Sequence, residues 1–161
     1  MKNLTAIALS VSISVFTAMA AEKSLKLESL PPAVRKTVKA EAQNATIVGI
    51  AKEKENGVTQ YEVETKVNGK VRDFNVDEKG VLLLVEEEAA LESFPAAARE
   101  ALMKKIGTGK VTLAETVKKG AETYYEVGFT NKAGKKSEVA VNADGSGHKS
   151  LLQNSVMRKL F

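Results

Sequence analysis

Carboxylates are the side chains of this sequence whose grouping could most readily do chemistry. Glu86, Glu87 and Glu88 are consecutive, and Asp77 and Asp144 stand in the stretches DEKG and NADGSG. Grouped carboxylate oxygens bind hard cations, so one hypothesis is a cation- or small-ligand-binding protein that uses these residues. Consecutive strand residues point to opposite faces, however, so the three glutamates are not expected to converge. The two stretches lack the spacing of an EF-hand and are predicted to be hairpin turns.

A catalytic centre is not predicted. The chain has one histidine, His148, in the glycine-rich stretch DGSGHKS, and it has no cysteine. One histidine without cysteine partners is a poor zinc ligand set, and we expect it on a surface turn. The sequence lacks the G-x-S-x-G motif that places a nucleophilic serine. Glu62 and Glu64 share a strand face that we expect to be exposed to water, whereas a general acid needs a sheltered carboxyl with a raised pKa. We therefore expect a non-enzymatic protein with no catalytic residue, no cofactor and no metal.

The first twenty residues predict export. The segment MKNLTAIALSVSISVFTAMA has an early lysine, a run of apolar and small residues, and an A-x-A sequence at Ala18–Ala20. This is the pattern of a signal peptide over residues 1–20 that is cut after Ala20, and it predicts a periplasmic or secreted protein. No later apolar stretch approaches the length that spans a bilayer, so no transmembrane segment is expected after cleavage.

The charge of the chain is mixed. Its 161 residues contain 24 Lys and Arg and 20 Asp and Glu, which gives a net charge of +4. Because the lysines are interspersed with acids and form no basic stripe alternating with aromatics, nucleic-acid binding is not expected.

The sequence repeats itself at an offset of 64 residues. LESLPPAVRKTV, which begins at Leu27, returns as LESFPAAAREAL from Leu91, and TQYEV from Thr59 returns as TYYEV from Thr123. After both Leu-Glu-Ser sequences a proline stands at the first turn of a predicted helix, where the backbone N–H that proline lacks would have no hydrogen-bond partner within the helix. The pattern predicts a tandem duplication, with a helix at the start of each half.

Strand patterns follow each predicted helix. They cover residues 45–54, 58–67, 70–76, 81–88, 110–117, 123–130 and 135–142. We predict an α+β fold: a tandem repeat of a helix packed on a four-stranded antiparallel sheet, with residues 25–88 as the first repeat and 89–150 as the second. Val81–Val85 is apolar at every position, so we expect it to be buried where the two halves meet.

Alternation along the strands separates a core face from a polar face. Tyr61 and Val63 belong to the face that the helices are expected to cover, and the opposite face is predicted to be open to solvent. On that open face we place a protein-binding site made of Glu62, Glu64, Lys66, Asp73, Tyr124, Glu126, Thr130 and Lys136. We predict that Tyr124 is the anchor, as an exposed aromatic among polar neighbours.

Several motifs together resemble a PepSY-like repeat. They are Leu30, Pro31, Ala33 and Val34 at the helix start, Tyr61-Glu62-Val63 in a strand, Gly69-Lys70 in a turn, and Val76, Asp77 and Gly80 before the last strand. Two such units in one exported chain are similar to the β-lactamase-inhibitor-like group of the PepSY-like superfamily, over about residues 25–149. The resemblance implies a small extracytoplasmic non-enzyme, related to inhibitory propeptides of proteases and to inhibitors that bind an enzyme with an open sheet face.

The expected function is therefore an exported binding or inhibitory module. Its partner is predicted to be a protein of the cell envelope, such as a secreted hydrolase or an envelope sensor, that contacts the polar sheet face. The C-terminal tail, residues 151–161, has Leu152, Val156 and Leu160 at helical spacing, with Arg158 and Lys159 beside them. Two hypotheses fit this tail: it docks on the core, or it forms a helix for a partner or a membrane surface.

Overall fold

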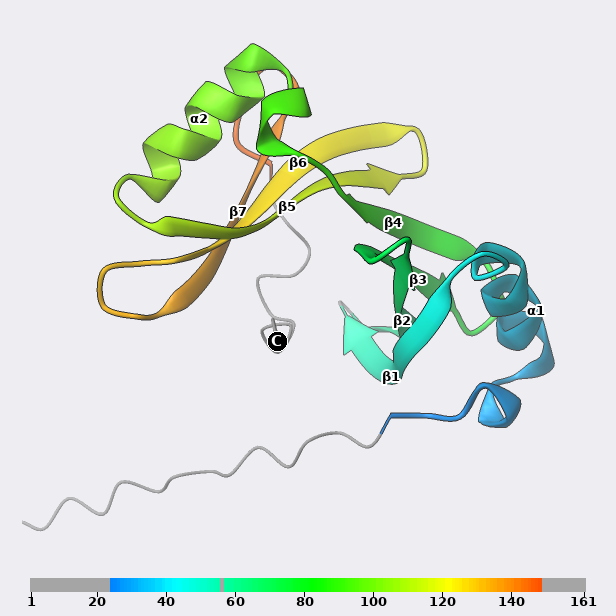
Figure 1. Ribbon diagram of the computed structural model, residues 1–161. Coiled ribbons are helices and arrows are strands. Elements are labelled where there is room, and N and C mark those ends of the chain that lie inside the picture. The colour runs from blue at the N-terminus through cyan, green and yellow to red at the C-terminus, as the bar shows by residue number, and fades with distance from the viewer. Residues whose placement is uncertain (1–23, 56, 149–161) are drawn as a thin grey trace, which may run out of the picture.

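The structure is a computed structural model that describes residues 24–55 and 57–148 (Figure 1). The predicted signal peptide over 1–20 and the predicted tail over 151–161 lie outside the described residues. The helical elements are η1 (Leu27–Ser29), α1 (Pro32–Glu41), η2 (Leu91–Ser93) and α2 (Ala96–Ile106). The strands are β1 (Thr46–Glu55), β2 (Val58–Val67), β3 (Lys70–Asp77), β4 (Leu82–Glu88), β5 (Lys110–Lys119), β6 (Glu122–Thr130) and β7 (Lys136–Asn142).

The strands form one antiparallel sheet in the order β1 to β7. The predicted strand stretches agree with these elements, but the predicted tandem repeat of a helix on a four-stranded sheet is wrong. The described residues build a single, mostly β, seven-stranded sheet with two helices, and residues 143–148 add an isolated bridge between Val141 and Gly147.

Pairing between β4 and β5 joins the two halves. It runs from Val85 opposite Lys118 to Glu88 opposite Glu115. An edge strand presents a row of N–H and C=O groups that needs partners, and β5 supplies them along the second half of β4. Sequence periodicity reports which face a residue occupies but not which strand lies beside it, so this pairing was not predicted.

The segment predicted to be buried between the halves is buried only in part. Val81 is 56% exposed and Leu82 is 38% exposed, whereas Leu84 and Val85 are buried. Since β4 meets β5 only from Val85 onward, the join lies over Val85–Glu88.

Both helices pack on the same face of the sheet, and each covers the apolar strand face that was predicted for its half of the chain. The core under α1 contains Val34 and Val38, and the core under α2 contains Leu102 and Ile106. The strand residues that these cores bury are Ile50, Tyr61, Val63, Phe74, Val76 and Val85 in the first, and Ala114, Val127 and Val141 in the second. Cross-strand partners point to the same side, so the pairing of β4 with β5 carries this face across the join.

The repeated Leu-Glu-Ser sequences form equivalent turns, η1 and η2, before the two helices. The Ser29 hydroxyl donates to the Lys26 carbonyl over 2.6 Å, and the Ser93 hydroxyl donates to the Ala90 carbonyl over the same distance. These serines therefore close the short turns η1 and η2, and each turn leads through a proline into its helix.

A substitution at Gly80 tests the contact between α1 and the turn before β4. Gly80 has φ +84°, and a Cβ there would lie 2.7 Å from the Ala33 carbonyl oxygen. We expect Gly80→Ala to lower the free energy of unfolding by about 3 kcal/mol, because a left-handed backbone and a clash with helix backbone add together. Gly69→Ala is the control: its φ is +82° but its Cβ would meet nothing within 4 Å, so about 1 kcal/mol is expected. Urea denaturation measures both, and equal losses would contradict the predicted clash.

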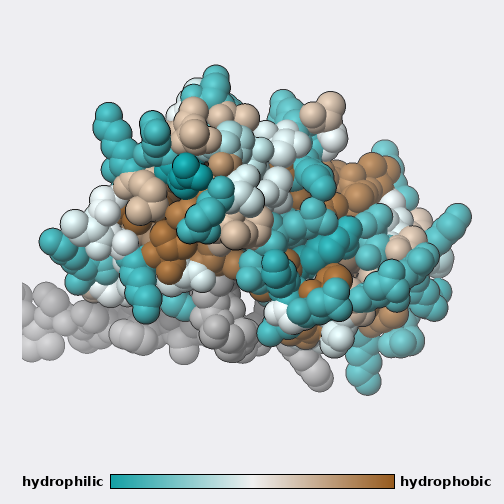
Figure 2. All heavy atoms as spheres, turned by 45° about the horizontal axis from the view of Figure 1, so that its top comes forward, coloured by the Kyte–Doolittle hydropathy of each residue, from teal (hydrophilic) through white to brown (hydrophobic). Residues whose placement is uncertain are grey.

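Within the described residues, no helix is long and apolar enough to cross a membrane. On the face shown in Figure 2, hydrophobic residues appear as patches between hydrophilic ones. The large hydrophobic side chains that are exposed are Val48, Val58, Val81, Leu82 and Met103.

Candidate functional site, an acidic sheet face

The sheet face opposite the helices carries acidic side chains from six strands. Cross-strand register places Asp73 opposite Glu86, and Glu115 lies between Glu88 and Glu126. We call this surface the acidic face and define its carboxylates as Glu62, Glu64, Asp73, Glu86, Glu88, Glu115, Glu126 and Glu138. Lys66 and Lys136 stand on the same side, at the ends of β2 and β7.

The centre of the acidic face is buried. Glu86 and Glu126 are 0% exposed, and Asp73, Glu62 and Glu115 are each less than a tenth exposed. The prediction of an open, wet face is therefore wrong at its centre. Several carboxylates that are brought together out of water repel one another and favour cationic neighbours.

A small apolar cluster lies within the acidic face. Leu84, Val117, Tyr124 and Ala140 form it, one from each of the strands β4 to β7. Tyr124 is 1% exposed, so its prediction as an exposed anchor is wrong. The physical reason is that residues 143–148 turn back beside β7, where Gly147 forms a bridge with Val141, and this return places the His148 ring on Tyr124.

His148 is the residue that covers Tyr124. The two rings stack with centroids 3.9 Å apart and an interplanar angle of 14°. The His148 backbone N–H donates to the Ala140 carbonyl over 3.2 Å, and its ring Nδ1 lies 2.8 Å from Asn142 Oδ1. The histidine is half-buried rather than on an open surface turn, so that expectation is also wrong.

All eight residues of the predicted binding site occur on the acidic face. Among them Glu62, Asp73, Tyr124 and Glu126 are buried, Glu64 and Thr130 are half-buried, and Lys66 and Lys136 are exposed. Sequence reasoning did not place Glu86 or Glu115 on this face, since it considered Glu86 only as a cation ligand beside Glu87 and Glu88, and it missed Glu138. Strand alternation in EEE and in KVTLAETV could have placed the first two on this side, but the β4–β5 register that brings them into one cluster has no sequence signal.

Two carboxylates of the acidic face also stabilise the sheet. Asp73 Oδ1 accepts a hydrogen bond from the Thr65 N–H over 2.9 Å, and Glu88 Oε2 accepts one from the Val71 N–H over 2.9 Å. These bonds link β2 with β3, and β3 with β4. Substitution of either residue would therefore affect stability as well as surface charge.

The environment of the cluster raises the pKa of Glu115. Burial is the largest cause that raises the pKa of its carboxyl to about 8, and the negative charges of Asp73, Glu138, Glu88 and Glu62 contribute in that order. A carboxyl with this pKa holds a proton at neutral pH and can donate a hydrogen bond.

The consecutive glutamates of β4 point to opposite faces, as predicted. Glu87 lies on the helix side, where its carboxylate is 3.0 Å from Lys118 Nζ and 3.4 Å from Arg72 Nε. The hydrogen bond from Lys118 is the main cause that lowers the pKa of Glu87. Glu86 and Glu88 belong to the acidic face, so the three carboxylates do not form one ligand set.

Asp77 and Asp144 stabilise hairpin turns, also as predicted. Asp77 Oδ1 accepts hydrogen bonds from the N–H groups of Lys79 and Val81 over 2.9 and 2.8 Å. Asp144 Oδ1 accepts them from the Ser146 hydroxyl and N–H over 2.6 and 2.9 Å, which lowers the pKa of Asp144. Across 24–55 and 57–148, no three His, Cys, Asp or Glu side chains are grouped as a metal site.

No family model and no curated protein matches this chain. One solved structure that resembles it is a protein from Bacteroides eggerthii that is provisionally assigned to the periplasm, with a TM-score of 0.59 and 16% identity over 74% of this chain and 86% of the other. A DUF2874 family protein from Bacteroides ovatus has a TM-score of 0.56 and 15% identity over 75% of this chain and 86% of the other. A BLIP-like protein from Bacteroides fragilis has a TM-score of 0.52 and 22% identity over 74% of this chain and 84% of the other. At these identities the likeness establishes the fold alone, and a PepSY assignment is not shown. The chain therefore has the fold of the BLIP-like and DUF2874 proteins.

Proposed function

We propose that this chain is an exported, non-enzymatic module that binds a protein partner through its acidic face. The observation that carries the proposal is the collection of carboxylates from six strands on one side of the sheet, although the whole chain has a net charge of +4. Such a segregation of charge favours a partner that presents Lys and Arg, because complementary potentials steer and orient association.

Two further observations support the compartment and the class of function. The signal-peptide pattern of residues 1–20 and the provisional periplasmic description of the Bacteroides eggerthii protein support a location in the cell envelope. The fold shared with a BLIP-like protein supports inhibition of the partner as the consequence of binding.

The way the reactive groups are used supports the non-enzymatic part of the proposal. His148, the only histidine in the sequence, stacks on Tyr124 and contacts Asn142. Glu115 holds its proton among other carboxylates, and it lies 3% exposed. The cation-binding alternative gains no support from Asp77, Glu87 and Asp144, which serve turns and ion pairs.

Charge reversal at the rim of the acidic face tests the proposed function. Wild-type protein on beads should capture a partner from periplasmic extract, and Glu64→Lys/Glu138→Lys should weaken that capture by about tenfold, since each reversed rim charge meets a cationic partner. Both positions lie outside the buried centre, so the fold should tolerate the change.

The matched control reverses two exposed glutamates on the helix side, Glu28→Lys/Glu100→Lys. It makes the same change in net charge without touching the acidic face. Equal capture by wild type and both variants, or equal loss in both variants, would show that the acidic face is not the binding surface.

A further inference from the structure

The described chain ends on the acidic face. His148 stacks on Tyr124 in the small apolar cluster, and its N–H binds Ala140 on β7. Ala140 is the cross-strand neighbour of Glu126, a fully buried carboxylate of that face. The described chain therefore ends beside the centre of the acidic cluster.

The next thirteen residues, 149–161, have the chemistry that complements this surface. They read KSLLQNSVMRKLF and carry three cations, Lys149, Arg158 and Lys159, with no acidic residue. Their leucines, Val156, Met157 and the final phenylalanine match the apolar cluster that interrupts the carboxylates. Charge and apolar complementarity thus coincide in one segment.

The length of the segment also fits. His148 is attached beside β7, and five strand spacings separate β7 from β2, which is about 24 Å across the sheet. Thirteen residues span about 20 Å as a helix and about 43 Å when extended, so an extended segment covers this distance. Segment 149–161 can therefore reach every carboxylate strand from its attachment at His148.

Asn75 adds an independent observation. It is 1% exposed, and its Oδ1 is a buried acceptor without a hydrogen-bond partner. Asn75 lies opposite Glu62 on β2 and Leu84 on β4, so it belongs to the same face. A buried acceptor in this position favours an occupant that brings N–H donors, as the guanidinium of an arginine does.

We propose that segment 149–161 docks on the acidic face of its own chain, with its cations toward the carboxylates and its apolar side chains over Leu84, Val117, Tyr124 and Ala140. This role rests on the proposed function: if a cationic partner binds the acidic face, the docked segment is an internal competitor that the partner must displace. A docked segment that occupies the face about nine-tenths of the time would weaken partner binding about tenfold.

The absence of cysteine makes a direct test of docking straightforward. A nitroxide on Ser155→Cys of the full chain should broaden the backbone amide signals of β4, β5 and β6 by paramagnetic relaxation. Adding Arg158→Glu/Lys159→Glu should restore those signals, because the reversed charges repel the carboxylates. Broadening that is absent, or that persists unchanged after charge reversal, would overturn the proposal.

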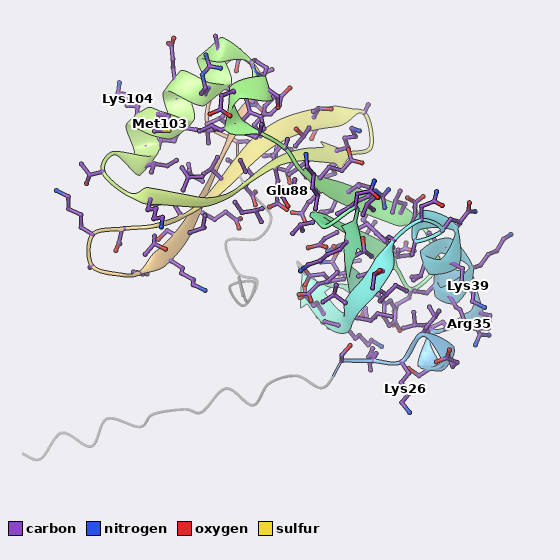
Figure 3. The ribbon with its side chains drawn as sticks, viewed as in Figure 1. Lys26, Arg35, Lys39, Glu88, Met103 and Lys104 are labelled. Carbon is purple, nitrogen blue, oxygen red and sulfur yellow. The ribbon has the colours of Figure 1, made fainter. Side chains whose placement is uncertain are left out.

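Two controls test whether the broadening is specific to the segment and arises within one chain. A nitroxide at Met103→Cys, exposed on α2 and pointing away from the sheet (Figure 3), should give a pattern that the charge reversal leaves unchanged. A mixture of ¹⁵N protein that carries no nitroxide and ¹⁴N protein that carries one distinguishes docking within one chain from binding to a second copy. Broadening in the mixed sample as strong as in the single-chain sample would overturn docking within the chain.

The partner measurement is independent of these spectra. Arg158→Glu/Lys159→Glu should increase the affinity for the captured partner about tenfold if the segment competes with it. Failure to find any partner would count against the proposed function alone, whereas the nitroxide experiment decides whether the segment docks. Docking without any change in partner affinity would overturn the competition.

Discussion

Replacing Phe74 with alanine is expected to lower the free energy of unfolding by about 4 kcal/mol, the usual cost of truncating a fully buried phenylalanine. The ring is 0% exposed and lies in the core under α1 with Val34, Val38 and Val63. The guanidinium of Arg72 stands 5.6 Å from its centroid and would lose that contact as well.

The same variant tests whether one sheet unfolds as one unit. Because β4 and β5 pair across the join, Phe74→Ala should shift a single urea transition that far-UV circular dichroism and tyrosine fluorescence report together. Leu102→Ala in the core under α2 is the matched control and should shift the same transition. Two separate transitions, with Phe74→Ala moving only one of them, would mean that the halves are independent despite their shared sheet.

Glu115→Gln is expected to stabilise the protein at alkaline pH. The folded state raises the pKa of this carboxyl from 4.5 to about 8. Between these two values the folded protein holds a proton that the unfolded chain releases, so stability falls as pH rises through that window. Below pH 4.5 both states are protonated and the burial of this group carries no electrostatic penalty.

Glutamine keeps the shape of the protonated acid and cannot ionise. We therefore expect Glu115→Gln to exceed the free energy of unfolding of wild type by about 5 kcal/mol at pH 9 and to match it near pH 4.5. Urea denaturation across this range measures the difference, and Glu122→Gln, at an exposed position of β6, is the control that should show no such trend. A constant difference between Glu115→Gln and wild type at every pH would contradict a raised pKa.

Side-chain pattern by itself determined the local structure. Alternation located the strands β1 to β7 and separated their faces, since an extended chain turns successive side chains to opposite sides. Proline after Leu-Glu-Ser marked both helix starts, and the spacing of Val34 and Val38 marked the covered face of α1. The same alternation put all eight predicted binding residues on one side of the sheet.

Only the tertiary structure decided which strands are neighbours and what becomes buried. Pairing of β4 with β5 replaced two predicted sheets with one and brought Glu115 beside Glu88. The return of the chain after β7 covered Tyr124 with His148. A period of two residues fixes the side on which a residue lies, whereas register between distant strands and the cover over a face depend on the free energy of the whole fold. For that reason the sequence located the acidic face but not its buried centre.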